Sequence, residues 1–288
     1  MIRKPRLVIF IAAIAAVFLM VIVLPRDNSL TKLQQAGVIR IGYAVEAPYA
    51  FLKPGGEVTG AEPEVAKIIV KRLGIERIEW HLYEFCDLIP ELEAGRIDAI
   101  SAGMFITSER AKHVSFSEPT FHVQEGLLVA AGNPLGIHSY EQAAKIPEIK
   151  IAVLTGSVEA RLLKKLGMNA SQLIHVPDTL TGLKAVETGT ADGLALSALS
   201  IRWLALQDHL KRTEMAEPFE QSNTETNRFN GYGAVVFQQE DKQLRDAWNK
   251  ELQSFLGSPE HLKLIESFGF TTNELPGEMS TKEIIFSP

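Results

Sequence analysis

Hydrophobic and polar positions along this chain switch repeatedly between two periods. The stretches 38–45, 75–85 and 96–105 place apolar residues at every second position or in short runs, which is typical of strands. The stretch 61–74 spaces its apolar residues three and four positions apart and ends at a glycine, so it predicts a helix, and 87–95 predicts another. The order strand–helix–strand–helix–strand indicates a parallel sheet with right-handed crossovers.

The same alternation starts again in the second half of the chain. It predicts strands at 149–155, 171–178, 191–197 and 231–239 and helices at 156–167, 180–189, 198–210, 240–257 and 259–269. The polar stretch 220–230 predicts a loop. We therefore expect an α/β protein with two lobes, joined by two crossing strands near 126–132 and 231–238, and with the final helices returning to the first lobe.

The N-terminus combines a basic start with a long apolar run. MIRKPR carries three positive side chains, and residues 7–24 contain no polar side chain. An apolar run of about 18 residues is typical of a secretion signal or of a single membrane anchor. Positive residues ahead of the run keep the N-terminus cytoplasmic. We expect residues 1–27 to be a signal peptide or an anchor, and the rest to be periplasmic or otherwise extracytoplasmic, held at the inner membrane if residues 7–24 are retained.

Composition excludes several functional classes. A formal net charge of −6 without a basic stripe argues against nucleic-acid binding. The single cysteine, Cys86, allows neither a disulfide framework nor a thiolate metal site, and we expect it to pack as a small buried hydrophobe. The seven histidines are scattered and follow no metal or nucleophile–base pattern. The sequence therefore predicts no metal, no cofactor and no enzymatic activity.

Candidate ligand contacts follow the strands of the first lobe. Open parallel sheets bind ligands beyond the carboxyl ends of their strands. The residues that follow these strands include aromatic rings, one acid, one arginine and one threonine: Tyr49, Phe85, Phe105, Glu46, Arg110 and Thr107. Any one aromatic residue here is about as often core as site, but their joint position at strand ends favours a site.

Arg110 and the segment TGSVEA (155–160) are the candidate anion contacts. Arg110 falls in the first turn of a predicted helix, where a guanidinium and free backbone N–H groups would suit a carboxylate, although a surface ion pair with Glu109 is the ordinary alternative. Gly156 and Ser157 lie where a strand meets a helix, and Ser157 would serve equally as a routine helix cap. Together with the aromatic residues, these groups describe a ligand with an anionic end and a cationic or delocalised end; each cation–aromatic contact contributes about 0.5–2 kcal/mol.

Several motifs resemble one known family. IRIGYAVEAPYAF, LIPELEAGRIDAISAGMFITSERAKHVSFSEP and GYGAVVFQQEDKQLRDAWNKEL are similar to the solute-binding proteins of polar amino-acid ABC importers, family 3 of the type II periplasmic group, over roughly residues 33–272. The resemblance implies the two-lobed Venus-flytrap fold with two crossing strands as its hinge. It also implies that Thr107 and Arg110 bind a ligand carboxylate, and that the partner is an ABC importer permease.

One departure from the family pattern concerns the ligand's cation. Amino-acid binders of this family usually carry an acid five residues after an aspartate at the end of a second-lobe strand, and here Asp192 is followed by Ser197. Within the family, EAPY, YEFCDLIPELEAGRIDAI and GMFITSER look most like ectoine- and hydroxyectoine-binding proteins. That likeness places Glu46, the three aromatic residues and Arg110 around the ligand, with Tyr49 where phenylalanine is expected and the Cys86 thiol beside them.

These expectations define domains and competing functions. The resemblance implies a first lobe at 33–128 and 235–275, a second lobe at 129–234 and a tail at 276–288. The main hypothesis is an importer's binding protein for a small zwitterion, ectoine or hydroxyectoine. The alternatives are a polar amino-acid receptor, with Glu46 or another acid holding the ammonium, and a sensory module anchored through residues 7–24. No cleavage signal of small residues follows Leu24, which favours a retained anchor.

Overall fold

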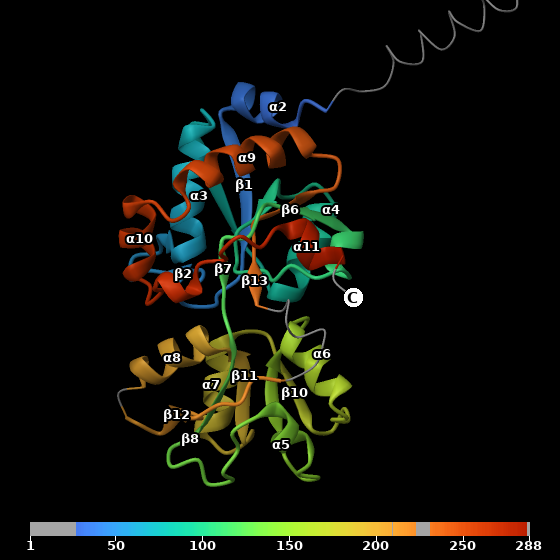
Figure 1. Ribbon diagram of the computed structural model, residues 1–288, viewed down its shortest axis with the longest axis vertical. Helices are drawn as coiled ribbons and strands as arrows, with labels where there is room; N and C mark the ends of the chain where they lie inside the picture. The colour runs from blue at the N-terminus through green and yellow to red at the C-terminus, as the bar shows by residue number, and fades with distance from the viewer. Residues whose placement is uncertain (1–26, 209, 223–230, 287–288) are drawn as a thin grey trace, which may run out of the picture.

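Two lobes make up the part of the chain that the computed structural model describes, residues 27–208, 210–222 and 231–286. Each lobe contains a five-stranded sheet, and the lobes lie one above the other in Figure 1. The α/β fold with two sheet-containing lobes is therefore confirmed. Two segments on which the sequence made predictions, 7–24 and 223–230, lie outside the described residues.

The sheet of the upper lobe has the order β4-β1-β5-β14-β6. Its strands are β1 (Val38–Tyr43), β4 (Arg77–Leu82), β5 (Ala99–Ile100), β6 (Val114–Phe116) and β14 (Val236–Gln238). Strands β4 and β5 pair with β1 in parallel, and β14 runs antiparallel to β5 and β6. The carboxyl ends of β4, β1 and β5 therefore meet at one edge of the sheet.

The last helices cover the same sheet. The helices of this lobe are α2 (Ser29–Ala36), α3 (Ala61–Arg72), α4 (Leu88–Glu93), α9 (Lys242–Phe255), α10 (Pro259–Glu266) and α11 (Thr281–Phe286), with short strands β2 (Phe51–Leu52) and β3 (Val58–Thr59) and the 3-10 turn η4 (Thr272–Glu274). Trp248 of α9 is fully buried in the same core cluster as Ile69 of α3 and Ile41 of β1. The prediction that the final helices return to the first lobe is confirmed.

The lower lobe repeats the architecture in the order β10-β9-β11-β8-β12. Its elements are β8 (Glu125–Ala130), α5 (Tyr140–Ala144), β9 (Ile151–Leu154), α6 (Val158–Lys165), β10 (Leu173–Val176), α7 (Thr179–Glu187), β11 (Gly193–Ser197), α8 (Ala198–Gln207) and β12 (Thr213–Met215). Strands β10 and β11 pair with β9 in parallel. Their carboxyl ends lie toward the upper lobe, because α6 and α8 begin there (Figure 1).

Two antiparallel strands connect the lobes. β7 (Phe121–His122) pairs with β13 (Tyr232–Gly233), and both lie between the two sheets in Figure 1. The first crossing lies a few residues before the predicted stretch 126–132, because residues 125–130 already belong to the lower sheet as β8, paired with β11. The second crossing falls inside the predicted stretch 231–238.

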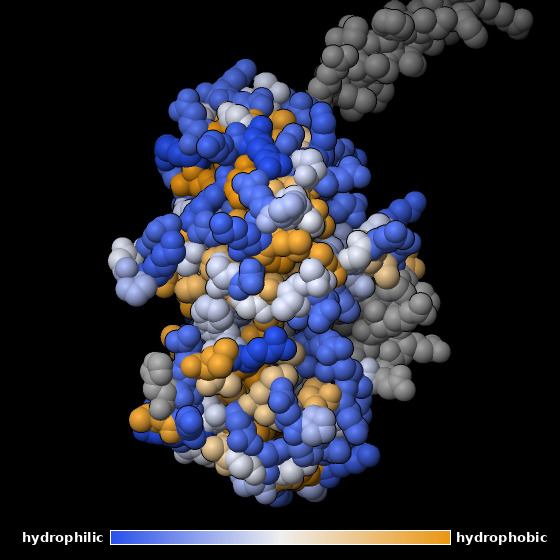
Figure 2. Space-filling model, turned by 60° about the vertical axis from the view of Figure 1, so that its left-hand side comes forward, coloured by the Kyte–Doolittle hydropathy of each residue, from blue (hydrophilic) through white to orange (hydrophobic). Residues whose placement is uncertain are grey.

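The face shown in Figure 2 is largely hydrophilic, with hydrophobic residues gathered in small separate patches. None of the helices within residues 27–286 that the structure describes is long and apolar enough to cross a membrane.

Candidate ligand-binding site

A hollow lies where the strand ends of the two lobes face each other. The space between its lining atoms, including its opening to solvent, is about 310 Å³. The residues that line this interlobe hollow are Glu46, Phe85, Gly103, Phe105 and Arg110 from the upper lobe and Leu154, Ser157, Val158, Glu159 and Leu196 from the lower lobe. A ligand in this hollow would contact both lobes.

The upper wall is built from the exits of three neighbouring parallel strands. Glu46 follows β1, Phe85 begins the 3-10 turn η1 (Phe85–Asp87) after β4, and Phe105 follows β5 and forms a bridge to Gly233 of β13. Because β4, β1 and β5 are adjacent, their exits bring these side chains to one wall. The structure therefore brings together the acid and two of the three aromatic residues that the sequence singled out.

Arg110 lies buried between the lobes. Its side chain is 6% exposed, and it donates to the carbonyl oxygen of Phe105 at 2.7 Å and to that of Gly156, in the lower lobe, at 3.1 Å. Its guanidinium carbon lies 5.3 Å from the centre of the Phe85 ring. Burial, and after it the nearby Arg161, lowers the pKa of Arg110, but a guanidinium remains protonated in proteins. The site therefore contains a buried cation whose hydrogen-bond partners are neutral.

Arg110 does not start the helix that the sequence predicted. It begins a three-residue 3-10 turn, η2 (Arg110–Lys112), and its backbone N–H donates to the Thr107 hydroxyl at 3.2 Å. The predicted helix is wrong because the chain enters β6 at Val114, which leaves room for a single turn. Thr107 does not line the interlobe hollow and supports the turn that carries Arg110.

The lower wall begins where β9 ends. Gly156 has a φ of +83°, in the left-handed region that favours glycine, and its carbonyl accepts from Arg110. Ser157 lines the hollow and also caps α6, because its hydroxyl accepts from the backbone N–H of Ala160 at 3.2 Å. Ser157 is thus the helix cap that the sequence allowed, and its contact with an anion stays a prediction.

Two hydrogen bonds between side chains tie the lobes together behind the hollow. The Tyr49 hydroxyl donates to Ser197 Oγ at 2.9 Å, and Ser200 Oγ donates to Glu46 Oε1 at 2.9 Å. Tyr49 is 1% exposed, and neither Tyr49 nor Ser197 lines the interlobe hollow. Together with the Arg110 bond, these contacts show that the structure is closed around the hollow.

Tyr49→Phe removes one of these interlobe bonds and leaves the ring in place. A buried hydrogen bond contributes about 0.5–1.5 kcal/mol, so ligand affinity should fall about 2- to 10-fold if binding requires closure. Titration calorimetry measures the change. Tyr140→Phe is the matched control, since that buried hydroxyl donates to Gly126 within the lower lobe at 2.7 Å. Equal affinities of the two variants would exclude a role of the Tyr49 bond in closure.

Burial governs the charge of the acids in the hollow. Burial, and after it the nearby Glu159, raises the pKa of Glu46 to about 8, in spite of the hydrogen bond from Ser200. Burial likewise raises the pKa of Glu159, which is 6% exposed. In the closed structure Glu46 is therefore mostly protonated at neutral pH, and the pKa of Glu159 is shifted in the same direction. A cation placed against the two acids would favour their charged forms.

Glu159 is the site residue that the sequence reasoning missed. It lies within the segment TGSVEA, two residues after Ser157, in the first turn of α6. An acid in the first turn of a helix is usually explained by its favourable interaction with the helix dipole, without a role in binding. The signal that could have found Glu159 is its position a few residues after the end of β9. The first turn of α6 lines the same hollow as Ser157, so its side chains are also candidate ligand contacts.

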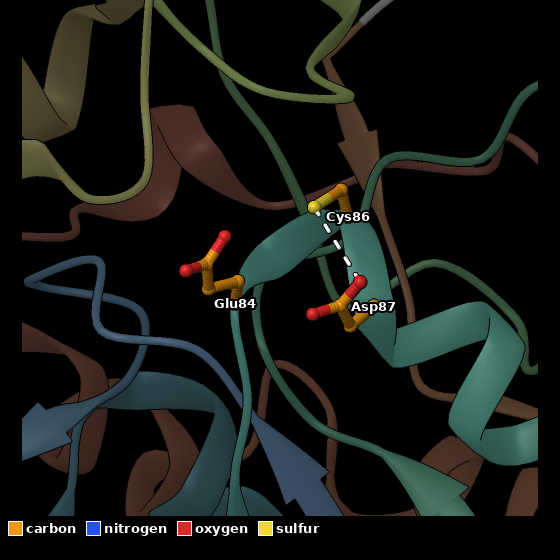
Figure 3. Close-up of side chains that lie close together, drawn as sticks. All are labelled: Glu84, Cys86 and Asp87. Carbon is orange, nitrogen blue, oxygen red and sulfur yellow. Dashed lines mark hydrogen bonds between the residues drawn. The ribbon is translucent and has the colours of Figure 1, made fainter.

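A cluster of potential metal ligands lies next to Phe85, after β4 (Figure 3). The ligand atoms of Glu84, Cys86 and Asp87 all lie within 4.8 Å of one another, and the Cys86 thiol donates to Asp87 Oδ1 at 3.7 Å. Both acids are exposed, as surface acids without an ion commonly are, and we assign no ligand to the cluster. Cys86 is half-buried, so the prediction of a buried hydrophobe is wrong. It faces the gap between the lobes, where a Cβ on Gly156 would lie 3.2 Å from its own Cβ.

Comparison with known proteins identifies the family. The model for bacterial extracellular solute-binding proteins, family 3, matches residues 39–271. The chain belongs to this family. This solute-binding protein thus serves an ABC importer for amino acids or related ligands, and its family places it outside the cytoplasm.

Three relatives illustrate the range of ligands in the family. The chain is 34% identical over 260 residues to a probable amino-acid ABC transporter periplasmic-binding protein, y4tE, of Sinorhizobium fredii (strain NBRC 101917 / NGR234), covering 89% of this chain and 85% of that one. It is 30% identical over 202 residues to a glutamine-binding protein of Geobacillus stearothermophilus, covering 67% and 74%. A crystal structure of EhuB in complex with hydroxyectoine superposes with a TM-score of 0.83 at 33% identity, covering 91% and 99%.

Proposed function

We propose that this solute-binding protein captures ectoine or hydroxyectoine and presents it to its importer. The ligand class is a small zwitterion with a carboxylate at one end and a delocalised cation at the other. The proposed contacts are Glu46, Tyr49, Phe85, Phe105, Thr107, Arg110, Gly156, Ser157 and Ser197. Four of these residues do not line the interlobe hollow: Tyr49, Thr107, Gly156 and Ser197. They would support binding indirectly, by holding the lobes closed or by positioning Arg110.

The observation that carries the proposal is the environment of Arg110. Its guanidinium is buried and bonded to two carbonyl oxygens, and no carboxylate among the described residues forms an ion pair with it. A buried cation without a directly bonded anion is costly, and Glu46 and Glu159 act on this one only through space. A ligand carboxylate would supply that anion, and the planar guanidinium can hold a carboxylate by two parallel hydrogen bonds.

The aromatic residues and Glu46 suit the other end of such a ligand. Phe85 and Phe105 both line the interlobe hollow, and their faces attract a delocalised cation. Glu46 lies on the same wall and can accept a hydrogen bond from an N–H group. The similarity to EhuB, whose structure contains hydroxyectoine, supports this ligand class.

A thermal-shift screen tests the proposal. The purified protein is heated with ectoine, hydroxyectoine, glycine betaine, proline or each of the twenty amino acids. A ligand at 100 times its dissociation constant adds about 2.7 kcal/mol of stability, which is readily detected. We expect a shift with ectoine or hydroxyectoine; shifts confined to ordinary amino acids would refute the proposal.

A polar amino-acid receptor is the second candidate. Two acids line the hollow, Glu46 and Glu159, and either could hold an α-ammonium in place of the acid that Ser197 replaces. Relatives described as amino-acid-binding proteins support this reading. The same screen decides between the two candidates.

Anchoring by residues 7–24 belongs to a separate proposal, that the chain works as a membrane-held binding or sensory module. The mass of the mature protein isolated from its own cell decides whether the segment is retained. A chain that begins at Met1 supports an anchor, and a shorter chain supports a cleaved signal peptide.

A further inference from the structure

The lower lobe contributes one charged group to the interlobe hollow, Glu159. Its side chain is almost fully buried, and burial raises the pKa of the carboxyl, while its own backbone N–H and the Ser157 hydroxyl act in the opposite direction. No lysine or arginine in the described parts of the chain forms an ion pair with it, although Arg110 and Arg161 are close enough to act on it through space. Glu159 is thus a buried acid at the ligand position without a direct cationic partner.

Ser197 cannot replace Glu159 as the lower lobe's acceptor. Its hydroxyl accepts from Tyr49 Oη at 2.9 Å and from the Ser200 backbone N–H at 3.2 Å, and it donates to Ser200 Oγ at 3.2 Å. These three bonds use the one donor and both acceptor positions of the Ser197 hydroxyl, so none remains for a ligand. Any hydrogen bond from a ligand cation to a charged group of the lower lobe therefore goes to Glu159.

The charges in the hollow call for more than one donor on the ligand's cation. Glu46 lies on the upper wall and Glu159 on the lower wall, while Arg110 is the one cation among the lining residues. If a ligand carboxylate pairs with Arg110, Glu46 and Glu159 are the two acidic acceptors that remain for the ligand's other end. A quaternary ammonium has no N–H group to offer, whereas an amidinium or guanidinium has donors on two sides.

We propose that Glu159 is a specificity-determining binding residue, which accepts a hydrogen bond from a second N–H group of the ligand cation while Glu46 accepts one from the opposite side. The site then selects carboxylates that carry an amidinium or guanidinium group over those that carry a quaternary ammonium. This inference rests on the proposed function, because it concerns the same site and the same ligand class.

Glu159→Gln tests the assignment with little change in shape. Titration calorimetry compares the wild type and the variant with ectoine, hydroxyectoine, L-arginine, L-glutamine and glycine betaine. We expect the variant to bind ectoine at least about 10-fold more weakly. Glu141→Gln is the matched control, since Glu141 lies in the first turn of α5 in the same lobe, away from the hollow, and it should leave every affinity unchanged. Glu159→Asp retains the charge with a shorter reach and should fall between the wild type and Gln; it is also the fallback if the Gln variant folds poorly.

The outcomes separate this inference from the proposed function. If the wild type ignores ectoine but binds L-arginine, and Glu159→Gln weakens that binding, the ectoine assignment falls and the role of Glu159 stands. If Glu159→Gln binds the wild type's ligand with unchanged affinity, Glu159 only supports α6 and the inference is overturned. Preferential binding of glycine betaine or L-glutamine by the wild type also overturns it.

Discussion

Arg110→Ala should weaken ligand binding about 30- to 4,000-fold. The variant leaves a buried ligand carboxylate without its cation, and such a truncation costs about 2–5 kcal/mol. It also removes the bond to the Gly156 carbonyl, one of the contacts that hold the lobes together. Titration calorimetry with the ligand from the thermal-shift screen measures the loss.

Two further variants separate charge, geometry and folding in this prediction. Arg110→Lys keeps the charge and loses the planar fork, so it should recover only part of the affinity. Arg202→Ala removes an exposed arginine of α8 that does not line the hollow, and this variant should bind like the wild type. Wild-type affinity in Arg110→Ala, with an unchanged melting temperature, would show that the ligand's anion is bound elsewhere.

Phe85→Ala should weaken binding about 30- to 150-fold. The Phe85 ring lines the hollow and lies against the Arg110 guanidinium, so the variant removes both a cation-binding face and the cover over the anion contact. Loss of a well-packed aromatic contact residue costs about 2–3 kcal/mol.

Phe85→Leu identifies which property of the ring is used. Leucine keeps most of the apolar surface but lacks the aromatic face. A ligand with a delocalised cation should therefore bind the Phe85→Leu variant several-fold more weakly than it binds the wild type. Calorimetry on both variants, with melting curves as the folding control, gives the comparison. Equal binding by phenylalanine and leucine would mean that the ligand presents an apolar group, not a cation, to this wall.

The pattern of apolar positions was sufficient to predict the strand exits. Glu46, Phe85 and Phe105 were found because a parallel sheet places successive strand ends at one edge, whatever packs around it. The periodicity did not predict the turn at Arg110 or the exact position of the first crossing strand. Arg110 lies in a 3-10 turn because β6 begins only a few residues later. The chain crosses to the lower lobe at β7, before the predicted stretch, because the residues of that stretch pair with β11 in the lower sheet as β8.

The sequence by itself determined the α/β fold, the family and the upper wall of the site, because all of them depend on periodicity and on motifs that are local in the chain. Tertiary structure alone decided that Tyr49 bonds to Ser197, 148 residues away, and lies behind the hollow. It also decided that Glu159 faces Glu46 across the closed lobes and that burial raises the pKa of both. These features arise only where the two lobes meet, and the separation between their residues leaves no periodic signal in the sequence.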